Sequence, residues 1–318
     1  MATDDPTVSV VLPTYERPAY LKRAAASVDA QTYDDIELIV VDDCSEPPAR
    51  SALAGLPLES LAAITYLRHE TNRGANAARN TGIEAANGEF VAFLDDDDWW
   101  EREKIERQVE RFHDAGSEVG VVYTGTRYVD VSGADDLVEV SEIEGKVTRE
   151  MLFGASMAEF SAVMVRASVI ETAGLPDERF PSWQDREWYL RLSRHCVFAV
   201  VPEPLTVRQQ GHGGQISDDY QRKRDVSYPL FLEKHRSLAA EYGPRFERAF
   251  VGALTRGLGK AAFRTENYRE ASVYLARSLR YDPFALDAYP YLLASLGGRR
   301  THRLARRAQE FAGTALPL

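Results

Sequence analysis

Four consecutive aspartates, Asp95 to Asp98, directly follow a short apolar segment, Phe90 to Leu94. A continuous apolar run of this kind is typical of a buried parallel strand, and ligands of open α/β sheets bind beyond the carboxyl ends of such strands. Neighbouring carboxylates resist joint ionisation, and a divalent cation such as Mg2+ or Mn2+ removes that cost because it prefers oxygen ligands. The run therefore predicts either a metal site or a solvated acidic turn before a helix that begins near Glu101.

Two earlier apolar segments also end in polar residues, and an arginine lies on the helix predicted before the acidic run. Tyr15 could stack on a base, and Asp43 could accept a hydrogen bond from a base or a sugar. Arg79 could pair with a diphosphate. Each of these residues alone is more typical of a turn, a helix cap or a solvated surface, but their joint occurrence favours a pocket. The polar residues at the two strand ends are Thr14, Tyr15, Glu16, Asp42 and Asp43.

Two candidates for chemistry occur further along the chain. Asp185 opens a predicted helix over Gln184–Leu192, where a carboxylate can cap the helix or serve as a general base. The segment from Arg208 to Ser217 is rich in glycine and could close over a ligand. Within it, His212 is either a third metal ligand or phosphate contact, or a histidine facing water.

The elements around these residues alternate between strands and helices of about a dozen residues, which predicts an α/β fold with a mostly parallel sheet. Right-handed crossovers then bring the polar strand ends to one edge. Neither a Gly-rich dinucleotide fingerprint nor a phosphate-cradling loop follows the first strand, so a metal would have to balance the charge of a bound diphosphate. The predicted strands are Val8–Leu12, Ile36–Val41, Ile64–Leu67, Phe90–Leu94, Val119–Val131, Ala162–Val165, Val197–Val201 and Leu205–Arg208.

An ordered set of five motifs resembles family 2 glycosyltransferases over about residues 6–217. The resemblance implies a GT-A fold and an enzyme that inverts the anomeric carbon of a nucleotide-diphosphate sugar. It also implies a catalytic domain over 1–220, with a nucleotide-binding half (1–100) and an acceptor half (101–220). The resemblance ends near Ser217, and the remaining region, 221–318, is predicted from its own residues to be helical. The motifs are Val8–Tyr15, Val40–Ser45, Asn72–Gly74 with Ala78–Gly82, Phe93–Trp100 and Gln184–Leu192.

The resemblance also implies roles for individual residues. Asp95 and Asp97 match the family's DxD motif, so Asp97 would bind Mn2+ or Mg2+, and Asp95 would bind the ribose or the metal. Asp185 matches the second member of the family's Glu-Asp pair and would be the base, although the first member reads Gln184 here. His212 would be a weaker third metal ligand, because its loop is longer than expected. The nucleotide and donor would be held by Thr14, Tyr15, Glu16, Asp43, Arg79, Asp95 and Asp96, with Asp96 and Asp98 mainly a spacer and a helix start.

These roles predict a metal-dependent transfer of a sugar from a UDP or GDP sugar to an acceptor hydroxyl. The acceptor is expected to be a saccharide or a lipid-linked saccharide of a surface glycan or glycoprotein, and no nucleic-acid partner is expected. One alternative is a non-catalytic nucleotide-sugar-binding or interaction protein that uses the helical tail. Another is a sugar nucleotidyltransferase, which the segment Pro13–Glu16 disfavours because those enzymes carry a Gly-rich loop with Arg and Lys there.

Charge is unevenly distributed along the chain. The 318 residues have a net charge of −11, whereas residues 222–318 hold 18 Lys+Arg and 9 Asp+Glu, a net +9. No window approaches the roughly 18 apolar residues of a membrane span, and the N-terminus lacks a signal-peptide pattern. Two cysteines define neither a disulfide framework nor a metal site. We therefore expect a cytoplasmic protein, with a possible place at the inner face of the cell membrane.

The C-terminal hundred residues are predicted to be helical. Positions from Leu254 to Pro283 resemble one tetratricopeptide-type helix pair, and a solenoid needs about three such repeats. The pair is therefore expected to pack on the catalytic domain. Residues 299–311 carry five arginines with Leu304, Ala308 and Phe311 on one helical face. This pattern predicts either a helix that lies on an anionic membrane or a final capping helix with a solvated basic face.

Overall fold

The computed structural model describes residues 7–130, 135–210 and 219–301. The chain divides into two compact units. The α/β unit comprises Met1–Thr148, Ser156–Glu178 and Gln184–Gly213, and the helical unit comprises Arg149–Ala155, Arg179–Trp183 and Gly214–Leu318.

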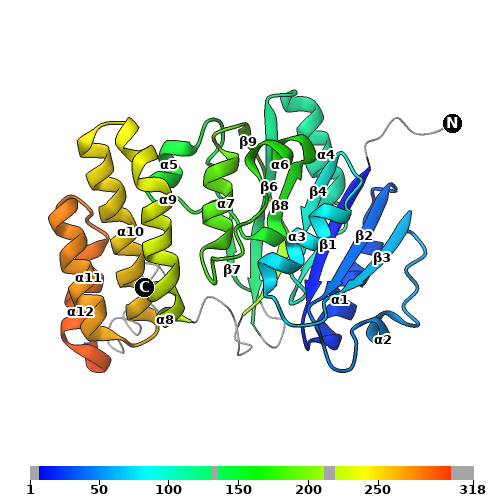
Figure 1. The fold of residues 1–318 in the computed structure, drawn as a ribbon, viewed down its shortest axis with the longest axis horizontal. Helices are drawn as coiled ribbons and strands as arrows, with labels where there is room; N and C mark the ends of the chain where they lie inside the picture. Colours follow the sequence, from blue (N-terminus) through cyan, green and yellow to red (C-terminus); the bar gives the residue numbers. More distant parts are fainter. Residues whose placement is uncertain (1–6, 131–134, 211–218, 302–318) are drawn as a thin grey trace. The chain divides into compact units, whose positions relative to one another are not determined.

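A single nine-stranded sheet organises the α/β unit, with the order β3-β2-β1-β4-β8-β6-β9-β5 and with β7 paired to β6 (Figure 1). The pairs β3-β2, β2-β1, β1-β4 and β6-β9 are parallel, whereas β4-β8, β8-β6, β9-β5 and β6-β7 are antiparallel. The predicted α/β class is confirmed, but the sheet is mixed rather than mostly parallel, with parallel pairing concentrated in the first half. The strands are β1 (Val8–Thr14), β2 (Ile36–Asp42), β3 (Ala63–Arg68), β4 (Phe90–Phe93), β5 (Asp98–Trp100), β6 (Val119–Val129), β7 (Asp135–Glu139), β8 (Val163–Arg166) and β9 (Val197–Gln209).

Register brings the polar strand ends together. Thr14 at the end of β1 pairs with Asp42 at the end of β2, and Val11 pairs with Phe93 of β4. The acidic run therefore begins at the same edge of the sheet as Thr14. The expectation that Asp98 starts a helix is wrong, because Asp98 opens β5 and pairs with β9, and the next helix begins only at Lys104.

Helices connect these strands, and one of them packs unusually close to the sheet. In α3 an added Cβ on Gly82 would lie 2.4 Å from Cγ1 of Val11, so the absence of a side chain permits this approach to β1. The helices of this unit are α1 (Pro18–Asp29), α2 (Arg50–Leu53), α3 (Ala75–Ala85), α4 (Lys104–Ala115), the 3-10 turn η1 (Phe160–Ala162), α6 (Ala167–Ala173) and α7 (Gln184–Leu192). Helix α5 (Thr148–Leu152) begins at the boundary between the two units.

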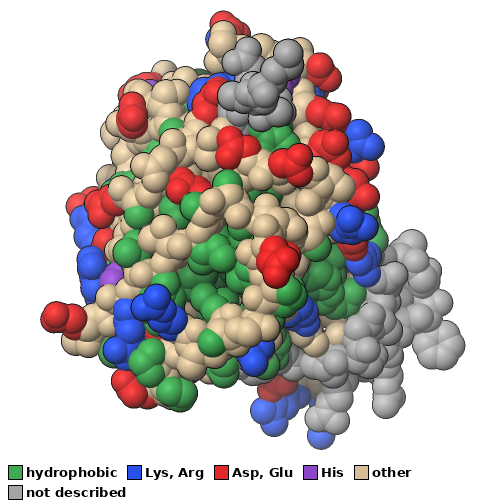
Figure 2. Space-filling model, turned by 90° about the vertical axis from the view of Figure 1, so that its right-hand side faces the viewer, with side chains coloured by type: hydrophobic (Ala, Val, Ile, Leu, Met, Phe, Trp, Pro, Cys, Tyr) green, Lys and Arg blue, Asp and Glu red, His purple; other side chains and the backbone are tan. Residues whose placement is uncertain are grey.

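Strand β3 forms one edge of the sheet and is more exposed than its neighbours. Ile64 of β3 is 45% exposed, while every residue of β1 and β2 is buried. Figure 2 shows this end of the molecule, where hydrophobic side chains reach the surface near the centre of the view. Single exposed apolar residues of this kind are ordinary on a protein surface.

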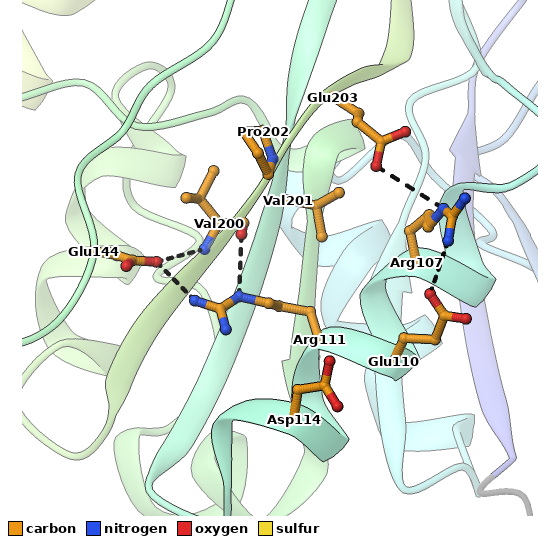
Figure 3. A pocket seen from close by; sticks show the side chains of 9 residues that line it. All are labelled: Arg107, Glu110, Arg111, Asp114, Glu144, Val200, Val201, Pro202 and Glu203. Carbon is orange, nitrogen blue, oxygen red and sulfur yellow. Dashed lines mark hydrogen bonds and ion pairs between the residues drawn. The ribbon is translucent and has the colours of Figure 1, made fainter.

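A shallow groove of about 430 Å³ lies between α4 and the middle of β9. Figure 3 shows that its charged groups are paired with one another: Arg111 donates to the Val200 carbonyl and to Glu144, and Arg107 lies against Glu110 and Glu203. None of the residues that line this groove was predicted as a site residue. The groove is therefore not the predicted nucleotide pocket.

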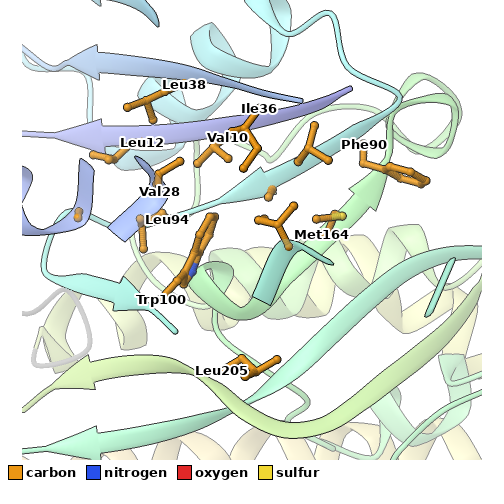
Figure 4. Packing of buried hydrophobic residues seen from close by; sticks show 14 of the residues in the cluster. Val10, Leu12, Val28, Ile36, Leu38, Phe90, Leu94, Trp100, Met164 and Leu205 are labelled. Carbon is orange, nitrogen blue, oxygen red and sulfur yellow. The ribbon is translucent and has the colours of Figure 1, made fainter. Parts of the chain in front are cut away.

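The main core lies on one face of the sheet. Figure 4 shows side chains of β1, β2 and β4, such as Val10, Leu38 and Phe90, gathered with Val28 of α1. Phe90 also stacks on Phe112 of α4, with ring centroids 4.3 Å apart. Burial of each such side chain stabilises the fold by about 1.5–3 kcal/mol relative to its exposed state. The apolar strands therefore form a rigid base beneath their polar ends.

The second unit is entirely helical among its described residues, as expected. Its core joins α10, α11 and α12 through residues such as Leu258, Leu275 and Tyr291. The tetratricopeptide assignment stays a prediction, and most of the 299–311 segment lies outside the described residues. Among the residues that are described, no helix is both long and apolar enough to cross a membrane. The elements are α8 (Tyr220–Arg222), a π-helical turn (Lys223–Ser227), α9 (Tyr228–Glu241), α10 (Pro244–Arg264), α11 (Tyr268–Tyr281) and α12 (Ala288–Leu296).

Candidate active site

The four aspartates of the acidic run alternate in exposure. Asp96 and Asp98 are buried, with 6% and 2% exposed, whereas the side chains of Asp95 and Asp97 are 31% and 17% exposed. The run forms a turn between β4 and β5, closed by a hydrogen bond of 3.1 Å from the N–H of Asp98 to the carbonyl of Asp95. The two partly exposed members are thus the pair predicted to bind metal and donor.

Asp96 is held at the end of β1. Thr14 donates a hydrogen bond of 2.7 Å to its Oδ2, and Arg17 lies 3.4 Å from its Oδ1. Burial raises the pKa of Asp96 to about 7, although the Thr14 hydrogen bond and Arg17 favour the carboxylate. Arg17 also lies 2.9 Å from Oδ2 of Asp97. Thr14, predicted as a nucleotide contact, is therefore a buried partner of the acidic run.

Asp98 is anchored by contacts with η1 and β9. Its Oδ2 accepts a 2.6 Å hydrogen bond from Ser161, and it pairs in register with Arg208 of β9. Burial raises the pKa of Asp98 well above its ordinary value, and the positive charge of Arg208 opposes this effect. The other carboxylate oxygen, Oδ1, is buried and lacks a hydrogen-bond partner among the described residues. Such an orphaned acceptor is uncommon in a folded protein and is often found at functional sites.

Arg79 on α3 connects the acidic run to α7. Its Nη2 donates to Oδ1 of Asp95 at 2.5 Å, and its Nη1 lies 3.4 Å from Oε1 of Gln184. The guanidinium stacks 4.0 Å above the ring of Phe160, and only 3% of the side chain is exposed. Arg79 therefore has protein partners rather than an open face toward a diphosphate.

Asp185 lies in the first turn of α7, one residue after the Arg79 contact. Its Oδ1 accepts a 2.7 Å hydrogen bond from the backbone N–H of Arg186. Burial raises the pKa of Asp185, and the negative charge of Glu159 adds to the rise, while Arg79 and Arg208 oppose it. A half-buried carboxyl with a raised pKa is suited to accept a proton from a hydroxyl near neutral pH.

Asp43 binds the backbone of the turn that leads into α3. Its two oxygens accept hydrogen bonds from the backbone N–H groups of Arg73 and Gly74, at 2.8 and 2.7 Å. His69 lies 2.7 Å from the same carboxylate, and its other ring nitrogen lies 2.9 Å from the Thr81 hydroxyl. Asp43 thus fixes the turn between β3 and α3 beside the predicted nucleotide pocket.

Tyr15 and Glu16 follow β1 and are exposed. Tyr15 is 45% exposed, which leaves its ring accessible for stacking. Glu16 adopts a left-handed backbone conformation with φ of 58°, which is unusual for a residue other than glycine. Its backbone N–H donates to Ser45, and its side chain accepts from the N–H of Glu46. These contacts hold the loop after β1 against the loop after β2.

The donor set of the acidic run fits a hard divalent cation. Asp95 and Asp97 offer carboxylate oxygens at a partly open edge, where each also pairs with one arginine, Arg79 and Arg17 respectively. Within the described part of the chain, no cluster of three or more His, Cys, Asp or Glu side chains forms a complete metal site. A cation bound here would take further ligands from water or from a bound phosphate, as Mg2+ commonly does. His212 lies outside the described residues.

The sequence interpretation missed several residues that the structure brings to this region. Arg17 is the clearest, because an arginine two residues beyond Tyr15 is a visible signal for pairing with the acidic run. Arg208 and Glu159 form an ion pair of 3.1 Å near Asp98 and Asp185. No local signal in the sequence indicates it, because Arg208 reaches this region through the pairing of β9 with β5.

Comparisons with known proteins bear on the family and the fold. Residues 9–166 match the family described as Glycosyl transferase family 2. Over 106 residues the chain is 41% identical to a putative teichuronic acid biosynthesis glycosyltransferase, TuaG, of Bacillus subtilis, a match covering 33% of this chain and 41% of that protein. Over 93 residues it is 38% identical to the GalNAc(5)-diNAcBac-PP-undecaprenol beta-1,3-glucosyltransferase of Campylobacter jejuni, covering 29% and 30% of the two chains. In length, the chain spans less than half of these relatives.

Solved structures share the fold. The mannosyltransferase PcManGT from Pyrobaculum calidifontis, determined in complex with GDP-Man and Mn2+, superposes with a TM-score of 0.59. The match covers 95% of this chain and 84% of that chain at 19% identity. At this identity the likeness establishes the fold, which is that of GT-A glycosyltransferases, and nothing about ligands.

Proposed function

The chain carries a glycosyl transferase family 2 domain, and on that premise we propose that it moves a sugar from a nucleotide-diphosphate sugar to an acceptor hydroxyl with inversion at the anomeric carbon. The observation that supports this proposal best is the double contact of Arg79. One side of its guanidinium binds Asp95 of the acidic run, and the other meets Gln184, next to Asp185. The buried side chain of Arg79 therefore contacts both the proposed donor site and the residue next to the proposed base.

The donor nucleotide binds at the edge formed by the ends of β1 and β2. Tyr15, with its exposed ring, stacks on the base. Asp43 and Glu16 shape the two loops that border the base, since both bind backbone N–H groups there. Thr14, Asp96 and Arg79 act in donor binding through the acidic run rather than by direct contact. The base is that of a UDP or GDP sugar.

Asp97 and Asp95 hold Mn2+ or Mg2+, with the diphosphate completing the ligand set. When bound, the cation offsets the negative charge that develops on the departing diphosphate. The chain's own contribution is to keep these two carboxylates at the open edge while Thr14, Arg17 and Ser161 hold the buried members of the run. His212 is retained as a further metal ligand only as a hypothesis.

Asp185 is the general base. It accepts the proton of the acceptor hydroxyl as that oxygen attacks the anomeric carbon from the face opposite the diphosphate. The N–H of Arg186 fixes one carboxylate oxygen, which orients the other. Alignment of the two substrates supplies much of the rate, because orientation removes a large entropic part of the barrier.

The acceptor is a saccharide, and we propose a lipid-linked saccharide of a surface glycan or glycoprotein pathway, used at the cytoplasmic face of the cell membrane. The printed names of the two relatives, one in teichuronic acid synthesis and one acting on an undecaprenol-linked glycan, support this class. In this proposal residues 1–100 bind the nucleotide, 101–220 bind the acceptor, and 221–318 form the helical region.

The experiment measures release of UDP or GDP from a panel of nucleotide sugars, with Mn2+, Mg2+ or a chelator present. We expect release that requires metal, is abolished in Asp97→Asn and Asp185→Asn, and is unchanged in Asp114→Asn, which alters an exposed aspartate of α4. Isothermal titration separates the two losses, because only Asp97→Asn weakens metal-dependent nucleotide binding. Full turnover in Asp185→Asn would remove the base assignment, and lack of release from every nucleotide sugar would refute the enzyme proposal.

A further inference from the structure

The helical unit carries an unusual concentration of exposed apolar side chains. Among the described residues, the five most exposed large hydrophobic side chains lie within 24 consecutive residues. Scattered exposed apolar residues need no explanation, but a group of this kind marks a surface that contacts another apolar phase. The five are Val273 (59% exposed), Phe284 (86%), Leu286 (74%), Leu293 (67%) and Leu296 (69%).

Val273 lies on α11, and the other four residues lie on α12 or on the loop that precedes it. Leu293 and Leu296 follow Tyr289 at helical spacings of four and seven, so the three side chains share one face of α12. The opposite face, which includes Tyr291 and Ala294, is buried in the core of the unit. Helix α12 is therefore apolar on both faces, and one of them is exposed.

Exposed arginines occur on the neighbouring helix and directly after α12. Helix α11 packs against α12 (Figure 1) and exposes Arg269, Arg277 and Arg280 at spacings that share one helical side. Arg299 and Arg300, also exposed, follow the end of α12. The apolar residues on 284–296 together with these five arginines are named the α11–α12 surface.

The acidic residues near this surface balance only part of its charge. Glu270 accepts hydrogen bonds from Tyr220 and Arg224, and Asp287 pairs with Arg256 and Lys260. Glu266 pairs with Arg299 of the surface itself, and Asp282 accepts a hydrogen bond from the N–H of Phe284. The five arginines outnumber Glu266 and Asp282, so the charge of the surface is positive in a chain whose net charge is −11.

We propose that the α11–α12 surface binds the interface of an anionic lipid bilayer. Phe284, Leu286, Leu293 and Leu296 enter the boundary between headgroups and acyl chains, and the arginines meet the lipid phosphates. A second copy of the chain is a poorer partner, because a symmetric contact places the same patch on both sides and brings like charges together. This inference concerns residues outside the sugar-transfer site and does not depend on turnover.

The test is flotation of the full chain with vesicles of phosphatidylcholine alone or with added phosphatidylglycerol. We expect the parent protein to bind the anionic vesicles. Its partition coefficient should fall by at least about tenfold in each of two double variants, because each removes two exposed apolar side chains. The variants are Phe284→Ser/Leu286→Ser and Leu293→Ser/Leu296→Ser. The matched control Ile64→Ser/Val138→Ser removes exposed apolar side chains from the α/β unit and keeps binding. Arg277→Gln/Arg280→Gln reduces binding to anionic vesicles only.

Circular dichroism and light scattering accompany each variant to establish its folding and its oligomeric state. Absence of the parent protein from floated anionic vesicles overturns the proposal. Equal flotation of parent and α12 variants also overturns it, and assigns any binding to another part of the chain. A dimer that the α12 variants dissociate identifies a self-association surface instead. If the parent protein floats with anionic vesicles but transfers no sugar, only the proposed function is refuted, and the membrane proposal stands.

Discussion

Arg79 and Asp95 form an ion pair of 2.5 Å in which the arginine is almost fully buried and the aspartate is partly open to solvent. The arginine comes from α3, the aspartate from the end of β4, and the same guanidinium reaches the start of α7. One buried cation therefore fixes the relative positions of three elements that border the candidate site.

Removal of this cation should destabilise the protein and disable the site. For Arg79→Ala we expect a loss of about 2–3 kcal/mol, somewhat less than for a fully buried pair because Asp95 is partly hydrated. Urea unfolding measures the change, with Arg102→Ala on an exposed position as the control. Arg79→Lys should recover part of the stability but not the turnover, because an ammonium cannot reach both Asp95 and Gln184 in the same geometry. Wild-type turnover in Arg79→Lys would contradict the positioning role.

The pH dependence of turnover should report on the surroundings of Asp185. Because burial raises the pKa of Asp185 and only its ionised form accepts a proton, kcat/KM should fall as pH drops through a value above that of an ordinary aspartate. Glu159→Gln removes a nearby negative charge and should shift this acid limb to lower pH. Arg208→Gln removes a positive charge and should shift it to higher pH. The control substitution Glu142→Gln, at an exposed position, should leave the acid limb of the pH profile unchanged. If Glu159→Gln and Arg208→Gln shifted the acid limb in the same direction, the assignment of that limb to Asp185 would be wrong.

Lys104 should make the stability of the protein depend on pH in the alkaline range. It is fully buried, with its Nζ 2.7 Å from Oε1 of Gln108 and 4.0 Å above the Trp100 ring. Burial lowers the pKa of Lys104 well below its ordinary value, so the unfolded chain binds more protons between that lowered pKa and about 10.4. The free energy of unfolding should therefore rise with pH across this window.

Lys104→Met should reduce that slope, as measured by urea unfolding at pH 7 and pH 9.5. The exposed substitution Lys22→Met should keep the slope of the parent. An unchanged slope in Lys104→Met would mean that Lys104 stays charged in the folded state.

Gly82 should not tolerate a side chain. An added Cβ would meet Val11 of β1 at 2.4 Å, so Gly82→Ala must push α3 away from the sheet, with an expected cost of about 1–3 kcal/mol for an overpacked contact. Glu84→Ala, on the exposed side of the same helix, should be nearly neutral. Thermal unfolding compares the two, and equal melting temperatures would show that α3 shifts freely. Because Arg79 lies on α3, nucleotide binding should weaken in Gly82→Ala as well.

The sequence predicts the strands and the polar edge well because both depend on local patterns. Apolar runs ending in Thr14, Asp42 and Asp95 mark the ends of parallel strands, and their side chains do gather at one edge. The sequence could not predict that Arg79 is buried, since its partners Asp95 and Gln184 lie on other elements. The roles of the site residues remain predictions that the experiments above test.

Strand β9 illustrates the limit of local signals. Pro202 and Pro204 suggest a break between two short strands, yet one strand runs from Val197 to Gln209. Its partner β6 has an irregular register between Thr124 and Thr126, around Gly125, which accommodates the proline-containing stretch. β5 pairs with β9 only after this stretch, at residues 206–208, so the prolines face no backbone acceptor from β5.

The pairing of Asp98 with Arg208 has a consequence for the order in which the chain folds during synthesis. Arg17 and Ser161 leave the ribosome before β9, so Arg208 reaches the acidic run after both of them. Until then the buried position of Asp98 lacks its positive neighbour, and β5 has no partner strand. The nascent α/β unit therefore cannot close around its acidic edge until synthesis has passed β9, which makes the donor site one of the last features of this unit to mature.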